Sequence, residues 1–309
     1  MRYGIIQPIL KIYHLQLIFP VIHFCLLVLS VMMIAAAGYI INDYFDVEVD
    51  EVNRPETQVI GKYFTAKSAY ISYYCINAVA LCISLFLCWK TDILSFFFIF
   101  PLTIGILWFY STTYKRQLLI GNFLVSFIIA VVPLLVPMFD IPPVYKKFHQ
   151  FFLETNQNLN ILFVWIGVFS LFAFLLNLTR EIVKDSEDFE GDIAYGRNTM
   201  PIFFGLKITK ASVVFLLTII LSIVGYFYFK YLLRVVVETL ENGITVSKSN
   251  YDIVTGLYLF FLIAIPIITT IVMIIMAKKK RHYSIVSGIL KFVMLMGICY
   301  SIVVYFKFL

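Results

Sequence analysis

Charged residues are scarce in this chain of 309 residues. They make up 14% of the sequence, compared with about a quarter in soluble domains, while 61% of the residues are hydrophobic. This excludes a soluble globular fold, because most of the surface must face lipid. The net charge of +6 comes from lysines and arginines scattered over short polar stretches. No basic segment resembles a nucleic-acid surface, so nucleic acid is not expected as a partner.

Cysteine and histidine are also sparse, and neither forms a metal-binding pattern. The five cysteines lie in apolar runs without a CxxC pair, so they are expected to be small core residues and not disulfides or zinc ligands. The four histidines are far apart in the sequence. Any bound metal is therefore expected to have oxygen ligands.

The sequence is rich in apolar runs long enough to cross a bilayer, which takes about 20 residues. Eight spans are predicted, at 21–45, 68–89, 93–114, 119–139, 161–183, 207–232, 251–277 and 285–308. These runs are too long and too uniformly apolar for barrel strands. The sequence therefore predicts an all-α, polytopic transmembrane helical bundle, with residues 1–309 forming one transmembrane domain. Residues 1–20 are interrupted by Pro8, Lys11 and Pro20 and are not predicted to span.

The few carboxylates are concentrated in two windows, residues 43–56 and 181–192, which hold twelve of the 18 Asp and Glu. Each window contributes to a set of three Asn or Asp side chains at helical spacing: Asn42, Asp46 and Asp50, and Asp185, Asp188 and Asp192. On a helix that continues out of its apolar run, each set lies along one face. A single pair of acidic residues at this spacing would indicate only a solvated loop. Two sets at helical spacing, each at the end of an apolar run, favour a functional site.

Both windows fall on the same side of the membrane if consecutive spans alternate in direction. The connections on that side carry fourteen Lys and Arg, including residues at helix ends, against nine on the other side. Cytoplasmic loops carry the excess of Lys and Arg. We therefore expect an integral protein of the inner or cytoplasmic membrane, with its site facing the cytoplasm.

Clustered carboxylates near a membrane are costly unless cations lie between them. Oxygen ligands favour Mg²⁺ or Mn²⁺, and Mg²⁺ commonly completes its shell with substrate phosphates. The two sets are therefore expected to bind metal, with Asp46 and Asp188 as their catalytic members. Nearby polar and basic side chains are expected to bind a diphosphate from both sides; these are Arg54, Tyr110, Lys115 and Lys184. Arg180 is expected to be a further substrate contact.

At these residues the sequence resembles the UbiA-type intramembrane prenyltransferase superfamily, which carries an NxxxDxxxD motif and a second, DxxxD-type motif. A YxxxxK element followed by Gly-Asn also matches, as Tyr110, Lys115, Gly121 and Asn122. The resemblance implies a bundle of nine helices around a lipid-open cavity, two Mg²⁺ ions, a bound prenyl diphosphate, and Asn122 as a further substrate contact. Residues 180–192 and the segment Asn198-Thr199-Met200-Pro201 look most like the digeranylgeranylglyceryl phosphate synthase branch.

The reaction implied by this resemblance is transfer of an isoprenyl group from a prenyl diphosphate to a lipid or aromatic acceptor, with release of pyrophosphate. A geranylgeranylglycerol-phosphate-like acceptor is favoured, and a quinone- or haem-type aromatic acceptor is the alternative within the family. A polytopic divalent-cation transporter is the alternative from another class, and it would place its acids near the membrane midplane. Only 41 residues precede Asn42, so we expect a truncated first helix, with residues 1–20 as its remnant.

Overall fold

The computed structural model describes residues 1–53, 55, 56, 58–156, 158–232, 234–239, 245–250 and 252–307. Within this part of the chain, eight helices are long and apolar enough to cross a membrane, which confirms the predicted all-α polytopic bundle. The main helices are α2 (Val21–Phe45), α4 (Ala66–Lys90), α5 (Ile99–Thr112), α6 (Ile120–Lys147), α8 (Asn160–Glu187), α10 (Met200–Phe227), α12 (Ile265–Met276) and α13 (Lys280–Lys307).

Shorter elements extend these helices or connect them. The α-helical ones are α1 (Gln7–Ile12), α3 (Val47–Asn53), α7 (His149–Thr155), α9 (Phe189–Ala194) and α11 (Ile253–Leu259). The π- or 3-10-helical ones are η1 (Arg2–Ile6), η2 (Leu94–Phe98), η3 (Tyr114–Arg116), η4 (Tyr228–Leu232) and η5 (Phe260–Ala264). Three spans are therefore composite: η2 leads into α5, α10 continues into η4, and α11 with η5 leads into α12.

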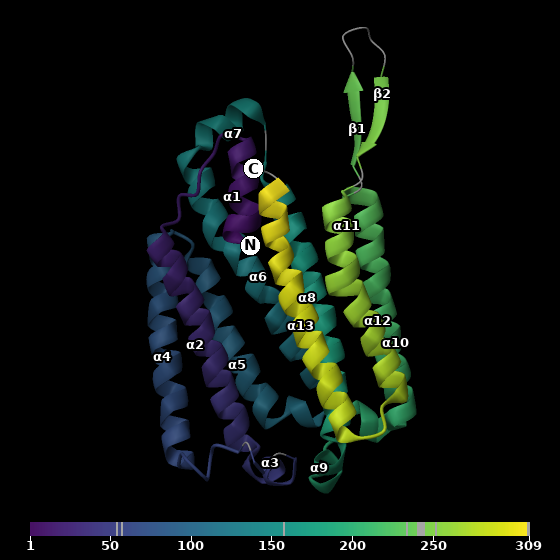
Figure 1. The fold of residues 1–309 in the computed structure, drawn as a ribbon. Helices are drawn as coiled ribbons and strands as arrows, with labels where there is room; N and C mark the ends of the chain where they lie inside the picture. The colour runs from purple at the N-terminus through teal and green to yellow at the C-terminus, as the bar shows by residue number, and fades with distance from the viewer. Residues whose placement is uncertain are drawn as a thin grey trace.

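The long helices form two groups that are joined through α6. Helices α2, α4 and α5 pack together on one side, and α8, α10, α12 and α13 form a four-helix group on the other (Figure 1). Helix α6 packs mainly along α8 and only lightly against α5. The four-helix group has its own apolar core, which includes the fully buried Leu217, Ile267 and Leu290. Many large apolar side chains face outward on all of these helices, as expected for surfaces in contact with lipid.

The segment before α2 is helical in its first part and packs inside the bundle. Segment η1 contacts α13, α6 and α8, and Ile5, Ile6 and Leu10 are completely buried. This stretch is not among the eight spans. It fills space between the end of α6 and α13 (Figure 1).

The connection between the spans predicted at 207–232 and 251–277 contains two antiparallel strands, β1 (Arg234–Thr239) and β2 (Thr245–Asn250). Arg234 pairs with Asn250 at one end of the hairpin, and Thr239 pairs with Thr245 at the other. The hairpin extends from the end of the bundle opposite to α3 and α9 (Figure 1). It therefore does not contribute to the charged site described below.

Candidate active site

The two acidic windows meet at one end of the bundle, where α3 and α9 lie side by side (Figure 1). Each window bends at its middle aspartate, because α2 ends before Asp46 and α8 ends before Asp188. Helical bonds cross both bends: the Asp46 amide donates to the Asn42 carbonyl at 3.0 Å, and the Asp188 amide donates to the Lys184 carbonyl at 2.9 Å. The helical spacing predicted from the sequence is therefore nearly preserved through both bends, although each helix is interrupted at its middle aspartate.

Lys115 contacts the first acidic window directly. Its Nζ atom lies 2.6 Å from Asp46 Oδ1 and 3.4 Å from Asn42 Oδ1. Both charged side chains are almost inaccessible, at 4% exposure for Lys115 and 9% for Asp46. Burial lowers the pKa of Lys115, and the charge of Asp46 only partly opposes that effect. Two residues that the sequence assigned to separate metal and diphosphate roles therefore form a buried ion pair.

Arg197 joins the two windows, although the sequence reasoning did not include it among the site residues. Its Nη2 atom contacts Asp46 Oδ1, and its Nη1 atom lies 3.3 Å from Asp192 Oδ1. Burial of the guanidinium lowers the pKa of Arg197, but the charges of Asp46 and Asp192 together outweigh this effect. The pKa of Arg197 is therefore raised. Nothing in the helical spacing predicts this contact, because Arg197 lies beyond the end of α9. Its position five residues after Asp192 was the only available signal.

A second polar network connects α6 to α8. Asn122 Nδ2 donates to Asp185 Oδ2 at 2.7 Å. One turn further along α6, the Ser126 hydroxyl donates to the Asn122 carbonyl at 2.6 Å and accepts from Asn177 Nδ2 at 3.2 Å. Ser126 and Asn177 are buried and were not predicted as site residues. This network fixes the orientation of Asp185 on α8.

The carboxylates of the two windows are close enough to influence each other. Burial raises the pKa of Asp192 to about 6; Arg197 opposes this shift, and the charges of Asp188 and Asp46 add to it. A carboxylate with a raised pKa beside other acids is stabilised in its ionised form by any cation that binds among them. The cluster therefore has the electrostatic character of a cation site whose negative charge is only partly compensated by Lys115 and Arg197.

The remaining predicted residues lie around this cluster. Tyr110 interacts electrostatically with Asp46, Asp185 and Arg197, and Lys184 interacts in the same way with Asp185. Arg180 instead pairs with its neighbour Glu181 at 2.6 Å. Asp50 continues the first window, its amide donating to the Asp46 carbonyl at 2.8 Å. The predicted diphosphate contact Arg54 lies outside the described residues.

The donor chemistry of the cluster fits a divalent metal bound together with a phosphate. Among the described residues, no three His, Cys, Asp or Glu side chains are already arranged as a metal cage. Mg²⁺ does not require such a cage, since it is usually bound by one or two carboxylates and completes its shell with water and substrate phosphate. Asn42 together with Asp46 and Asp50 of the first window could serve this purpose, and the second window offers the three predicted aspartates.

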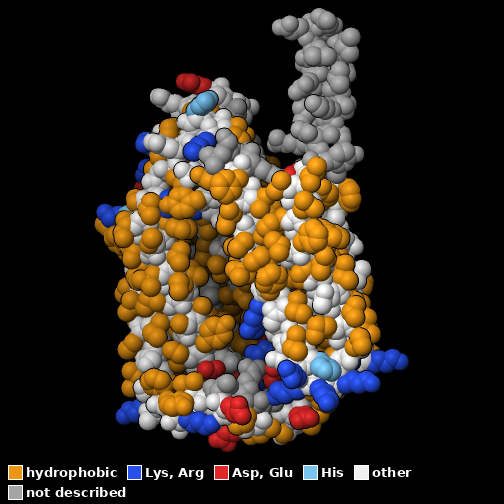
Figure 2. All heavy atoms as spheres, in the orientation of Figure 1, with side chains coloured by type: hydrophobic (Ala, Val, Ile, Leu, Met, Phe, Trp, Pro, Cys, Tyr) orange, Lys and Arg blue, Asp and Glu red, His pale blue; other side chains and the backbone are white. Residues whose placement is uncertain are grey.

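A recess between the two helix groups leads down to the charged end of the bundle. Figure 2 shows apolar side chains along its walls and both acidic and basic side chains at its lower end.

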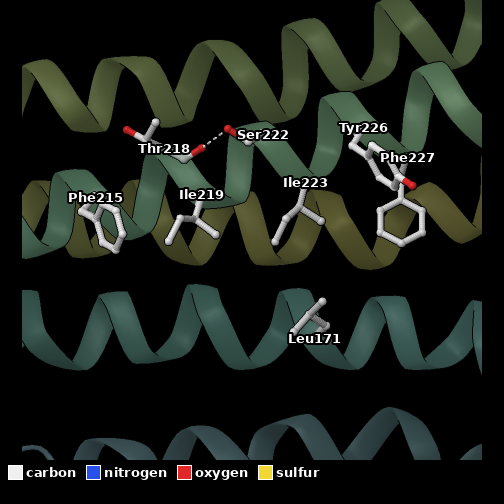
Figure 3. A pocket seen from close by; sticks show the side chains of 8 residues that line it. All are labelled: Leu171, Phe215, Thr218, Ile219, Ser222, Ile223, Tyr226 and Phe227. Atoms are coloured by element: carbon white, nitrogen blue, oxygen red, sulfur yellow. Dashed lines mark hydrogen bonds between the residues drawn. The ribbon is translucent and has the colours of Figure 1, made fainter.

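Two apolar cavities lie elsewhere. A groove of about 470 Å³ lies between α8 and α10, where Leu171 lies across from Ile223 (Figure 3). A chamber of about 380 Å³ lies between α8, α10, α13 and the span that begins with α11 and η5. Neither cavity is lined by a carboxylate.

The family model of the UbiA prenyltransferase family matches residues 13–239 of the chain. The chain belongs to that family. It is an integral membrane protein with eight spans in its described part, and all of the predicted Asn and Asp ligands of this UbiA member lie inside the matched region. The predicted superfamily membership is thereby confirmed.

Several archaeal proteins named digeranylgeranylglyceryl phosphate synthase are similar to this UbiA member. The one from Pyrococcus horikoshii is 34% identical over 206 residues, which cover 66% of the chain and 65% of that protein. The one from Thermococcus sibiricus is 30% identical over 221 residues, covering 71% and 69%. The alignments thus span about two thirds of the length of these relatives.

Two solved structures share the fold. A structure of digeranylgeranylglyceryl phosphate synthase superposes with a TM-score of 0.57 at 23% identity, covering 93% of this chain and 87% of that one. The apo structure of a UbiA homologue from Aeropyrum pernix K1 superposes with a TM-score of 0.60 at 14% identity, covering 96% and 94%. At these identities the likeness concerns the UbiA fold alone.

Proposed function

We propose that this protein is a Mg²⁺-dependent intramembrane prenyltransferase that transfers an isoprenyl group from a prenyl diphosphate to a geranylgeranylglycerol-phosphate-like acceptor. The site would bind two Mg²⁺ ions, one on each acidic window, and would face the cytoplasm. The observation that carries the proposal is the meeting of both windows at one charged cluster, where Lys115 and Arg197 contact the same oxygen of Asp46.

The donor set supports a divalent metal as the cofactor. UbiA family enzymes generally use divalent metal ions. Asn42, Asp46 and Asp50 would hold one ion, and the three aspartates of the second window would hold the other. When bound, the ions supply the positive charge that stabilises a departing diphosphate.

The basic side chains of this chain would bind and orient the diphosphate. Lys115 and Lys184 would donate hydrogen bonds to its oxygens, as would Arg54, and Tyr110 would donate its hydroxyl proton to another. Hydrogen bonds to a charged acceptor are short and strong, particularly in a site with little water. These residues thereby favour breaking the bond between C1 of the prenyl group and its diphosphate oxygen.

The acceptor hydroxyl would form the new bond. Its oxygen attacks C1 as the C1–O bond to diphosphate breaks, and its proton passes to the departing pyrophosphate. The apolar walls of the recess exclude water from the developing carbocation, which would otherwise be hydrolysed. The same walls would receive the prenyl chain laterally from the bilayer, consistent with a recess that is apolar above its charged end (Figure 2).

A turnover assay on the detergent-purified protein tests this function. Labelled geranylgeranyl diphosphate and geranylgeranylglycerol phosphate are supplied with Mg²⁺, and both pyrophosphate and the lipid product are measured. Wild-type protein should produce the two in equal amounts, and Asp46→Asn and Asp188→Asn should each lose both products. Glu48→Gln and Glu190→Gln serve as matched controls, since each removes an exposed carboxylate from the same windows.

The alternatives give different results in the same assay. Product formation only with an aromatic acceptor would assign a quinone- or haem-type transferase. Full turnover by both Asp variants would refute the assignment of the site. A divalent-cation transporter would move metal into sealed vesicles without prenyl diphosphate. In this protein α3 and α9, which carry parts of the two acidic windows, lie at one end of the bundle rather than at its midplane (Figure 1).

A further inference from the structure

Arg197 lies on a segment that is tied to both sides of the charged cluster. Its backbone amide donates to the Asp192 carbonyl at 2.9 Å, and the next amide, of Asn198, donates to the Arg116 carbonyl at 3.0 Å. Gly196 immediately before it has a φ of 64°, a left-handed conformation that glycine adopts without strain. The turn therefore holds Arg197 between α9 and the η3 segment that carries Lys115.

The Arg197 side chain crosses from the second acidic window to the first. Its two terminal nitrogens contact different carboxylates, Asp46 and Asp192, and only 12% of the side chain is exposed. Arg197 and Asp46 are 151 residues apart in the sequence. The planar guanidinium suits this bridge, because its donors are fixed in a fork, whereas a lysine ammonium is a single point of charge.

Removing this bridge would leave acids facing acids. Asp46 would keep Lys115, but Asp192 would remain buried near Asp188 and Asp46 without its cation. Like charges at short range repel strongly where water is excluded. The two windows would therefore be expected to move apart, although both must act on one diphosphate.

We propose that Arg197 is a positioning residue that holds the two acidic windows at the spacing needed to bind divalent ions and a diphosphate between them. The proposal rests on the proposed prenyltransferase function of the same site. It assigns Arg197 no contact with the reacting atoms. The residue acts through Asp46 and Asp192, whose carboxylate groups it orients.

Binding of Mn²⁺ alone, measured by electron paramagnetic resonance on purified protein without prenyl diphosphate, tests the proposal. Arg197→Gln keeps hydrogen-bonding capacity but removes the charge, and it should bind Mn²⁺ about tenfold or more weakly, since outer groups that orient metal ligands typically contribute 10- to 100-fold to affinity. Arg197→Lys restores the charge without the fork and should give an intermediate affinity. Lys207→Gln, which removes an exposed positive charge from α10, should bind as wild type does.

Thermal unfolding of each variant accompanies the binding measurement. Weaker Mn²⁺ binding by a variant with a wild-type melting temperature supports positioning rather than a general loss of fold. Unchanged or tighter binding by Arg197→Gln would overturn the proposal, because Arg197 would then be only a competing cation. If Arg197→Gln does not fold, Arg197→Lys decides: wild-type affinity there would show that bridging both carboxylates is unnecessary.

Failure of the proposed function would look different. In that case wild-type protein would bind Mn²⁺ and Arg197→Gln would bind it more weakly, but neither would release pyrophosphate from labelled geranylgeranyl diphosphate. The positioning role would then stand for a metal site of another activity. Pyrophosphate release that is normal in wild type, with Mn²⁺ affinity unaffected by Arg197→Gln, would instead refute the role of Arg197 alone.

Discussion

Lys115 Nζ and Asp46 Oδ1 lie 2.6 Å apart, in an ion pair that is nearly sealed from solvent. This pair places a cation on Asp46, one of the proposed metal ligands, beside the proposed diphosphate site. Lys115→Met should therefore reduce turnover of geranylgeranyl diphosphate by about 100-fold or more, the usual effect of removing one donor to a developing negative charge. Steady-state pyrophosphate release, with kcat and KM separated, measures the loss.

Two further variants control this prediction. Lys115→Arg retains the charge and should recover part of the activity, while Lys210→Met removes a lysine that donates instead to the Ala277 carbonyl and should leave turnover unchanged. Wild-type kinetics in Lys115→Met would mean that Lys115 only compensates the charge of Asp46. The diphosphate-binding role would then be wrong.

Gly121 controls where Lys115 sits. A Cβ atom at Gly121 would come within 2.8 Å of the Tyr114 carbonyl oxygen and 2.9 Å of Lys115 Cα, so the η3 backbone would have to shift. Gly121→Ala should lower turnover by at least about tenfold, since small displacements of a catalytic group are costly. Gly105→Ala on α5 has open space around the added methyl and serves as the control in the same assay. Equal activities of the two variants would contradict the prediction.

The sequence was sufficient to predict the architecture because each membrane span is defined by the hydropathy of about 20 consecutive residues, not by any single residue. The span expected at 21–45 coincides with α2, and all eight spans are present. Helix ends were predicted less well: α6 was expected to stop at 139 but continues through Pro142 and Pro143 to Lys147. Prolines are tolerated in membrane helices because neighbouring groups satisfy the freed carbonyls, so the local signal for a helix end was misleading.

Helical spacing predicted the site only in part. It selected two sets of three Asn and Asp residues, because side chains at helical spacing share a helix face, and their role as metal ligands stays a prediction. It could not reveal that α2 and α8 bend at Asp46 and Asp188, since each bend involves a single residue. Arg197 was missed because a turn at Gly196, not a helix face, brings it to Asp46. Arg197 and Asp46 are 151 positions apart, so their contact depends on tertiary packing, which the local spacing of residues does not predict.

Asn77 on α4 is a buried polar residue whose replacement should stabilise the protein. It is 6% exposed, and neither its amide nitrogen nor its amide oxygen has a hydrogen-bond partner among the residues that the structure describes. An unsatisfied buried polar group costs about 1–3 kcal/mol. Asn77→Leu, which has nearly the same shape, should therefore raise the free energy of unfolding by about 1 kcal/mol in denaturant titrations of the detergent-purified protein. A lower stability of this variant would imply that Asn77 has a polar partner in the bilayer.

Asn177 provides the matched contrast. Its Nδ2 donates to Ser126 Oγ at 3.2 Å, so Asn177→Leu breaks a buried network and should destabilise the protein in the same titration. Opposite signs for the two Asn→Leu changes would show that hydrogen-bond satisfaction decides the outcome. The same sign for both would contradict this.

Disruption of the buried Arg2–Asp140 ion pair should strongly destabilise the protein. Arg2 Nε lies 3.2 Å from Asp140 Oδ1, the two side chains are 2% and 0% exposed, and the guanidinium also contacts the Phe19 carbonyl and stacks over Phe24. Asp140→Leu leaves a buried positive charge alone and should cost about 3–5 kcal/mol of unfolding free energy, whereas adding Arg2→Met should restore most of it. Denaturant unfolding of the two single variants and the double variant gives the coupling. If the losses of unfolding free energy in the two single variants simply added in the double variant, the predicted coupling between Arg2 and Asp140 would be wrong.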